Sequence, residues 1–272
     1  MDWGSILNNT LAGLLTPTTL AFGLAALGLA MHFGFAGLLN FGIAGFMAVG
    51  AYGYAISVLT FGLPWWLGMI MGVVASVIFA LIMGIPTLRL RGDYLAIVTI
   101  AAAEILRLLF LTTAFEPVTG SADGLFGYNS KGGFSSANPF PPGSYGFGPW
   151  TYNSETLWTL VFGLIVMAAA ATLLWALMRS PWGRVIKGIR EDEDAVRALG
   201  KNVFAYKMQA LIIGGVFGAL GGIILATSTN VSPGVYVTSL TFFLWTALLL
   251  GGAATIFGPI LGSILFWVLQ AF

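Results

Sequence analysis

Long apolar runs, separated by short polar stretches, occupy most of the chain. A bilayer core about 30 Å thick is crossed by about 20 apolar residues in a helix. Runs of about that length predict transmembrane spans over residues 11–31, 41–60, 65–85, 94–115, 156–178, 208–226 and 236–257. Another run begins at Ile260 and is cut off at Phe272, so we expect a truncated last span. The pattern predicts an all-α, polytopic transmembrane helix bundle of about eight spans, forming one domain over residues 1–272.

Positive charges gather at two places that are two predicted spans apart. Arg89 and Arg91 flank the third span, and the segment 179–207 follows the fifth. Because positive residues stay on the cytoplasmic side, one topology satisfies both clusters and puts the N-terminus outside. The loop 116–154 then faces outside, with Lys131 as its only cation. This loop is rich in Gly, Pro and aromatic residues, and we interpret it as either a docking surface for an extracellular partner or a plain lid.

Composition agrees with a membrane protein and excludes several function classes. Apolar residues make up 58% of the chain and charged residues 8%, against roughly 45–50% and about 25% in soluble domains. A net charge of +1 leaves no basic excess for nucleic acid. With no Cys and one His, we expect no metal site, cofactor or catalytic residue, and we expect His32 at the cytoplasmic boundary. Residues 1–3 lack the positive stretch of a secretory signal, so we expect the first run to be retained.

The segment 179–207 is built to meet water, since it carries 11 of the 21 charged residues. Ser180 followed by Pro181 is a typical helix start, and Gly200 is a typical residue after a helix end. Between them, apolar residues at helical spacing form one stripe: Ile186, Ile189, Val196 and Leu199. Glu193 stands four residues before Arg197, the favourable order for an exposed ion pair. The pattern predicts one short amphipathic helix over residues 181–199, on the cytoplasmic side.

This predicted helix is a candidate docking element for a cytoplasmic protein. A solvated connector is one alternative, but a connector rarely needs an apolar stripe beside concentrated charge. A helix in the lipid interface is another, but such helices favour Lys and Arg, and four consecutive acids would be repelled by anionic lipid. The candidate docking residues are Arg184, Lys187, Arg190, Glu191, Asp192, Glu193, Asp194 and Arg197.

Three collinear motifs resemble those of the branched-chain amino acid permeases of ATP-binding-cassette (ABC) importers, specifically the second of their two membrane subunits. The motifs are PTLRLRGDYLAIVT at residues 86–99, SPWGR at 180–184 continuing into IREDE and ALGKN, and GG at 251–252 followed by GP at 258–259 and Gly262. The chain departs from the family pattern at Ile43, where the family often has His or Gln. Its short C-terminal run is a second departure.

The resemblance implies a multi-pass protein of the bacterial inner membrane that works in a complex. Its partners would be a second permease subunit, cytoplasmic ATPase subunits and an extracytoplasmic solute-binding protein, with membrane lipid around it. The helix after Pro181 would be the coupling helix that fits a groove in an ATPase. The chain carries no GxxxxGK[ST] motif for wrapping phosphates, so we expect ATP hydrolysis on a separate subunit. Transport would proceed by alternating access.

Polar residues inside the predicted spans are candidates for the translocation path. Glu104 and Arg107 lie three apart on one helix face and can pair; such a pair serves a path or locks one helix against another. If Glu104 carried a proton, the protein would instead be a secondary transporter, although one pair is few charges for that class. Further path candidates, chosen by polarity alone, are Asn40, Tyr52, Thr99 and Trp245.

Small residues also predict close helix packing and a small solute. Gly214, Gly218 and Gly222 repeat every four residues, as do Gly258 and Gly262. Such stripes bring helices into contact, and we interpret them as packing within one subunit rather than a dimer seam. Apolar and small side chains along the path suit a neutral or zwitterionic solute with an aliphatic body. Urea and short amides remain alternatives to branched-chain amino acids.

Overall fold

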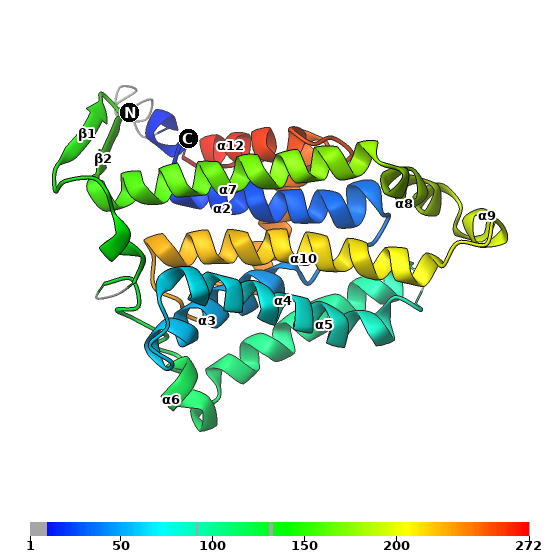
Figure 1. The fold of residues 1–272 in the computed structure, drawn as a ribbon, viewed down its shortest axis with the longest axis horizontal. Coiled ribbons are helices and arrows are strands. Elements are labelled where there is room, and N and C mark those ends of the chain that lie inside the picture. Colours follow the sequence, from blue (N-terminus) through cyan, green and yellow to red (C-terminus); the bar gives the residue numbers. More distant parts are fainter. Residues whose placement is uncertain (1–9, 91, 131–132, 272) are drawn as a thin grey trace.

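The computed structural model describes residues 10–90, 92–130 and 133–271, and Figure 1 shows long helices lying side by side along the longest axis. Arg91, Lys131, Phe272 and residues 1–3 lie outside the described residues. In chain order the helices are α2 (Pro17–Leu29), the π-helix η1 (Ala30–Phe35), α3 (Ile43–Leu59), α4 (Trp65–Thr87), α5 (Gly92–Leu111), the 3-10 helix η2 (Thr113–Phe115), α6 (Glu116–Thr119), the 3-10 helix η3 (Phe134–Ala137), α7 (Ser154–Arg179), α8 (Pro181–Glu191), α9 (Glu193–Ala198), α10 (Val203–Ser228), α11 (Thr238–Gly251) and α12 (Gly258–Ala271). Strands β1 (Ser144–Phe147) and β2 (Trp150–Asn153) form an antiparallel hairpin in which Ser144 pairs with Asn153.

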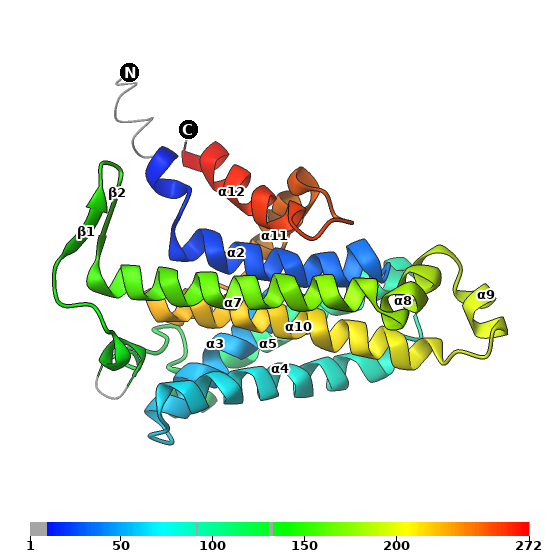
Figure 2. The same ribbon diagram turned by 45° about the horizontal axis from the view of Figure 1, so that its top comes forward.

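A helix occupies each predicted span, so the polytopic helical fold is confirmed. Within the described residues, five helical stretches are long and apolar enough to cross a membrane: Pro17–Phe35, α4, α5, α7 and α10. Helices α3, α11 and α12 are apolar but shorter, at 17, 14 and 14 residues. Fourteen residues extend about 21 Å, less than the roughly 30 Å of a bilayer core. Figure 2 shows α11 and α12 as a short hairpin beside α2.

A helix cap and a glycine conformation explain why two observed helices are shorter than the predicted spans. The first was predicted to begin at Leu11, but α2 begins at Pro17 because the Thr16 hydroxyl accepts from the Thr19 amide at 3.1 Å and caps the helix. The span predicted over 236–257 is also too long. Its helix ends at Gly251 because Gly252 adopts a φ of +99°, a left-handed conformation that glycine tolerates.

The buried centre of the bundle is formed by α2 and α10, with α3 and α4 packed against α10. The glycine stripe on α10 makes this packing possible. A Cβ added to Gly214 would collide with His32, and one added to Gly222 would collide with the Met47 backbone. The prediction that these glycines pack helices within one subunit is therefore confirmed. Helix α5 lies at the periphery, and only Leu95 and Thr99 of its residues are buried.

The two polar segments lie at opposite ends of the bundle (Figures 1 and 2). The β-hairpin and α6 mark one end, called here the hairpin end, and α8 with α9 mark the other, called the α9 end. The hairpin-end loop packs firmly on the helices: the buried Phe134 ring stacks on Trp158 at 5.3 Å. The Tyr128 hydroxyl donates to the Ala226 carbonyl at 2.8 Å, and burial raises the pKa of Tyr128 well above its usual value. Tyr128 therefore stays protonated as a donor.

Candidate functional site

The segment after α7 folds as two helices, so the prediction of a single helix over 181–199 is wrong. The Ser180 hydroxyl accepts from the Gly183 amide and Pro181 takes the first position, which starts α8 as predicted. Asp192 then adopts an extended conformation, with φ −151° and ψ 102°. Its carboxylate accepts from the amides of Asp194 and Ala195, both at 3.0 Å. Asp192 is therefore the N-cap of α9. In the sequence it could be recognised only as one of four consecutive acidic residues.

The break at Asp192 changes which apolar residues face the bundle. Ile186, Ile189 and Val196 are buried, as the predicted stripe requires. Leu199 was predicted to continue that stripe but is 79% exposed. It follows Ala198, the last residue of α9, and directly precedes Gly200, whose φ of +76° matches its predicted role after a helix end. The segment therefore holds to the bundle through three apolar residues and presents one leucine outward.

Ion pairs tie α9 to α10. The predicted pair is present: Arg197 Nη2 donates to Glu193 Oε1 at 2.9 Å, and Arg197 Nη1 donates to Asp194 Oδ1 at 2.6 Å. The other oxygen of Glu193 accepts from Lys207 on α10. Lys207 keeps only 13% of its side-chain surface exposed, so this bond is better shielded than the exposed pairs, which contribute about 0–1 kcal/mol each. Glu193 is therefore an internal clamp rather than a free docking charge.

The remaining candidate docking residues split between the bundle and the solvent. Arg190 donates to the carbonyl of Gly34 at the end of α2 and η1, so it holds α8 to the bundle. Three other candidate docking residues are exposed to solvent: Arg184, Lys187 and Glu191. With Asp194, they form a mixed-charge outer surface.

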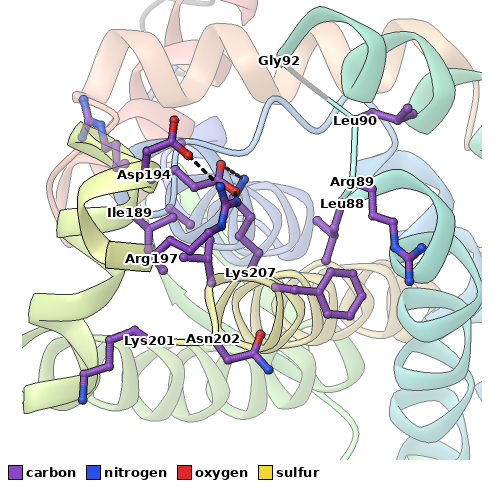
Figure 3. A pocket seen from close by; sticks show the side chains of 16 residues that line it. Leu88, Arg89, Leu90, Gly92, Ile189, Asp194, Arg197, Lys201, Asn202 and Lys207 are labelled. Carbon is purple, nitrogen blue, oxygen red and sulfur yellow. Dashed lines mark hydrogen bonds and ion pairs between the residues drawn. The ribbon is translucent and has the colours of Figure 1, made fainter. Parts of the chain in front are cut away.

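A cavity of about 970 Å³ opens between this segment and the helix ends (Figure 3). Among the described residues, five cations line it: Arg89 after α4, Arg190 on α8, Arg197 on α9, Lys201 before α10, and Lys207 on α10. The carboxylates on its wall are Glu193 and Asp194. Figure 3 shows Arg89 across the cavity from Asp194 and Arg197. The α9 end therefore carries a positively charged hollow directly beside the segment predicted to dock a partner.

Three of the predicted path residues meet at a break between η1 and α3. Residues 37–42 are not helical, and irregular backbone within a membrane protein must satisfy its polar groups. The Thr99 hydroxyl accepts from the Phe41 amide at 3.0 Å, and Asn40 Oδ1 accepts from the Gly42 amide at 2.7 Å. Trp245 Nε1 donates to the Asn40 carbonyl at 3.2 Å. All three side chains are buried and engaged, so in this conformation they hold the break instead of lining an open path.

Glu104 and Arg107 form the predicted pair on α5. Arg107 Nε lies 3.0 Å from each carboxylate oxygen of Glu104, and Arg107 Nη2 lies 2.5 Å from Oε1. The Thr238 hydroxyl, at the start of α11, donates to Glu104 Oε2 at 3.4 Å. The Glu104 side chain is 37% exposed and that of Arg107 20%. The pair therefore joins α5 to α11 and also faces outward. The sixth path candidate, Tyr52, is buried between α3 and α5, with its ring 4.1 Å from that of Phe110.

Several residues that matter in the structure were not predicted. The burial of His32 is one example: its side chain is fully buried, its Nε2 lies 3.0 Å from the Leu211 carbonyl, and its Nδ1 accepts from Asn40 Nδ2 at 3.0 Å. The sequence did hold a sign of this burial, because His32 is a single histidine inside an apolar run. Thr241, whose hydroxyl accepts from the Ala44 amide at 3.3 Å, gave no signal, since the two residues lie far apart in the chain.

Comparison with known proteins decides the family. The model of the family described as "Branched-chain amino acid transport system / permease component" matches residues 11–272. The chain belongs to this family. LivM, the high-affinity branched-chain amino acid transport system permease protein of Salmonella typhimurium, is 31% identical over 262 residues, which cover 91% of this chain and 60% of LivM. LivM of Escherichia coli gives the same identity and coverage.

Family membership confirms the resemblance of the three motifs and leaves the solute open. The nucleoside ABC transporter permease protein NupC of Lactococcus lactis is also related, at 24% identity over 243 residues, covering 85% of this chain and 71% of NupC. The chain spans about 60% of the length of the LivM relatives. The fold, the motifs and the family together describe a multi-pass membrane protein with a polar segment at each end.

Proposed function

We propose that the chain is the membrane-spanning permease subunit of an ABC importer in the bacterial inner membrane, which translocates small amino acids of the branched-chain type by alternating access. The observation that carries the proposal is the α8–α9 segment: its apolar face is buried on the bundle, while its outer face carries charges and the exposed Leu199. Such a segment suits docking to a soluble protein. The 31% identity to LivM, against 24% to NupC, favours amino acids over nucleosides.

The proposed partner at the α9 end is the ATPase subunit, and this end then faces the cytoplasm. Leu199 offers an apolar anchor for a pocket, and Glu191 and Asp194 offer exposed charges on the same segment. The ATPase supplies all nucleotide chemistry, and the permease is not an enzyme. The cations of the cavity lie on the cytoplasmic side in this orientation, which agrees with the distribution of positive charge in membrane proteins.

The contacts of the segment give the coupling a physical route. The Arg190 bond to Gly34 connects α8 to η1, which continues α2, and the clamp of Glu193 on Lys207 connects α9 to α10. Helices α2 and α10 are the buried centre of the bundle. When the ATPase subunits close on ATP, movement of α9 is transmitted to these two helices. Alternating access then requires two arrangements of the bundle, of which ATP binding favours one.

The remaining partners are assigned to the other surfaces. We assign the solute-binding protein to the hairpin end, where the loop 116–154 is packed on the helices and forms an ordered surface. We assign the second permease subunit to the exposed side of α5 and α11, because the charges of Glu104 and Arg107 lie partly open there and are costly to face toward lipid. Lipid covers the other apolar faces.

Reconstitution tests this proposal. The tagged chain, co-expressed with its second permease and ATPase candidates, is expected to copurify with an ATPase. In vesicles with the binding protein, the complex is expected to accumulate leucine only when ATP is hydrolysed. Reversing charge at Glu191 and Glu193 together should abolish that coupling while the complex remains in the membrane. Accumulation of a solute by the chain alone, driven by a proton gradient, would replace the proposal with a secondary transporter; accumulation of urea or short amides instead of leucine would change the solute.

A further inference from the structure

The cavity at the α9 end carries positive charge that its own carboxylates do not compensate. Within the part of the chain that the structure describes, its wall holds five cations against two carboxylates, which leaves a net charge of +3. Both carboxylates bind Arg197, and one of them also binds Lys207. Arg89, Arg190 and Lys201 make no ion pair with any described residue. These three side chains therefore leave room for an external anion.

Contacts with uncharged groups position two of these three cations. The Arg89 guanidinium lies 5.9 Å from the centre of the Phe204 ring, on the first turn of α10, and an aromatic face attracts a cation without neutralising it. Arg190 donates to the carbonyl of Gly34, which is also a neutral acceptor. Figure 3 shows Arg89 on one side of the cavity and Lys201 on the other. The uncompensated charge is therefore spread around the cavity.

The size and the lining of the cavity indicate a ligand larger than a single ion. Its volume of about 970 Å³ lies at the upper end of the range for small-molecule sites, about 300–1,000 Å³. Leu88, Leu90 and Phe204 line the cavity together with the cations. A negatively charged group attached to an apolar body would use both kinds of lining.

The cavity lies at the level where lipid headgroups meet the bundle. Helix α4, which ends just before Arg89, has 23 residues, and α10, which begins at Val203, has 26. These helices extend about 35 and 39 Å and exceed the roughly 30 Å of a hydrocarbon core, so their ends reach the headgroup layer. At the same end of α7, Arg179 stacks over the Trp175 ring at 4.2 Å, and Trp is enriched at membrane interfaces.

We propose that this cavity binds the headgroup of an anionic phospholipid, with Arg89, Arg190 and Lys201 contacting its phosphate. Basic pockets between transmembrane helices on the cytoplasmic side are suited to such headgroups. The phosphate supplies the negative charge that the three cations lack, and it joins the end of α4 to α8 and to the start of α10. The inference goes beyond the proposed function and does not rest on it, because the lipid binds whether or not a solute is transported.

Native mass spectrometry of the purified full chain tests the inference, because it counts bound lipids individually. The chain in neutral detergent is titrated with phosphatidylglycerol and, separately, with phosphatidylcholine that carries the same acyl chains. The first phosphatidylglycerol is expected to bind at least about tenfold more tightly, because it is anionic and phosphatidylcholine is neutral overall. Arg89→Gln and Lys201→Gln are each expected to weaken phosphatidylglycerol binding about fivefold, the effect of removing one cation.

Two cations on α8 provide matched controls. Arg184 and Lys187 are exposed at the same end of the bundle but do not line the cavity. Arg184→Gln and Lys187→Gln make the same change in net charge and are expected to leave phosphatidylglycerol binding unchanged. The melting temperature of each lipid-free variant verifies its folding. Since Arg89 and Lys201 lie in different segments and have no ion pair to lose, a folding defect in one variant leaves the other as the test.

Three results would overturn the inference. Equal affinity for the two lipids would show that the headgroup charge is not recognised. Equal weakening by the α8 controls would show that phosphatidylglycerol responds to the overall charge of this end and not to the cavity. The third result concerns inorganic phosphate, the other source of the same anion: if it displaces phosphatidylglycerol and raises the melting temperature of the lipid-free chain as much as the lipid does, the cavity binds a soluble anion instead of a lipid.

Discussion

Asp192 offers a sharp test of how the α8–α9 segment works, because its role in the structure differs from the role suggested by its charge. Its carboxylate accepts from the amides of Asp194 and Ala195 and caps α9, a helix of six residues. Helices this short are marginal on their own. Replacing Asp192 with Ala removes the cap, which costs about 1 kcal/mol and lowers the folded fraction of α9 relative to its unfolded fraction about fivefold.

The control is Asp192→Asn, which removes the charge and keeps the cap, since Asn caps as well as Asp. In reconstituted complexes, Asp192→Ala is expected to lower ATP-driven uptake and to raise hydrogen exchange about fivefold at residues 194–199. Asp192→Asn is expected to behave like the original chain in both assays. If Asn proved as harmful as Ala, the negative charge would be the active feature and the capping argument would be wrong. Unchanged exchange in the Ala variant would refute it equally.

Three further predictions address the bundle. Thr99→Val leaves the partly buried Phe41 amide without its acceptor and should cost about 1–3 kcal/mol of stability, seen as a lower melting temperature in detergent, while Thr99→Ser should not. Gly222→Ala drives a Cβ into the Met47 backbone and should abolish recovery of folded protein, measured by size-exclusion chromatography. Any uptake that remains in Glu104→Gln should not depend on a proton gradient, as in the original chain. If uptake by the original chain depends on the gradient and uptake by the variant does not, a secondary transporter is favoured instead.

The sequence predicted those features that depend on local patterns. Apolar runs located the helices because lipid exposure demands them, and Ser180-Pro181 and Gly200 marked helix ends through backbone rules that need no tertiary contact. The α10 glycines and the Glu104–Arg107 pair followed from helical spacing alone.

The features that the sequence did not predict depend on contacts between distant segments. The break at residues 37–42 exists because Thr99 and Trp245 supply hydrogen bonds from other helices. Leu199 left its predicted apolar stripe because the Asp192 cap restarted the helix in a different phase. Asn40 and Thr99 were predicted to line the path because they are polar. In the structure their polar atoms accept hydrogen bonds from backbone amides. No spacing rule separates a polar residue that satisfies a broken helix from one that faces a solute.

Leu199 allows the proposed docking of α9 on the ATPase to be measured directly. The chain contains no cysteine, so Leu199→Cys creates a unique thiol at the exposed end of α9. In inside-out membrane vesicles stripped of ATPase, a water-soluble maleimide is expected to label this thiol rapidly. Adding back the ATPase subunits is expected to protect it, and removing them to restore labelling. Labelling at the same rate with and without bound ATPase would show that α9 does not dock there.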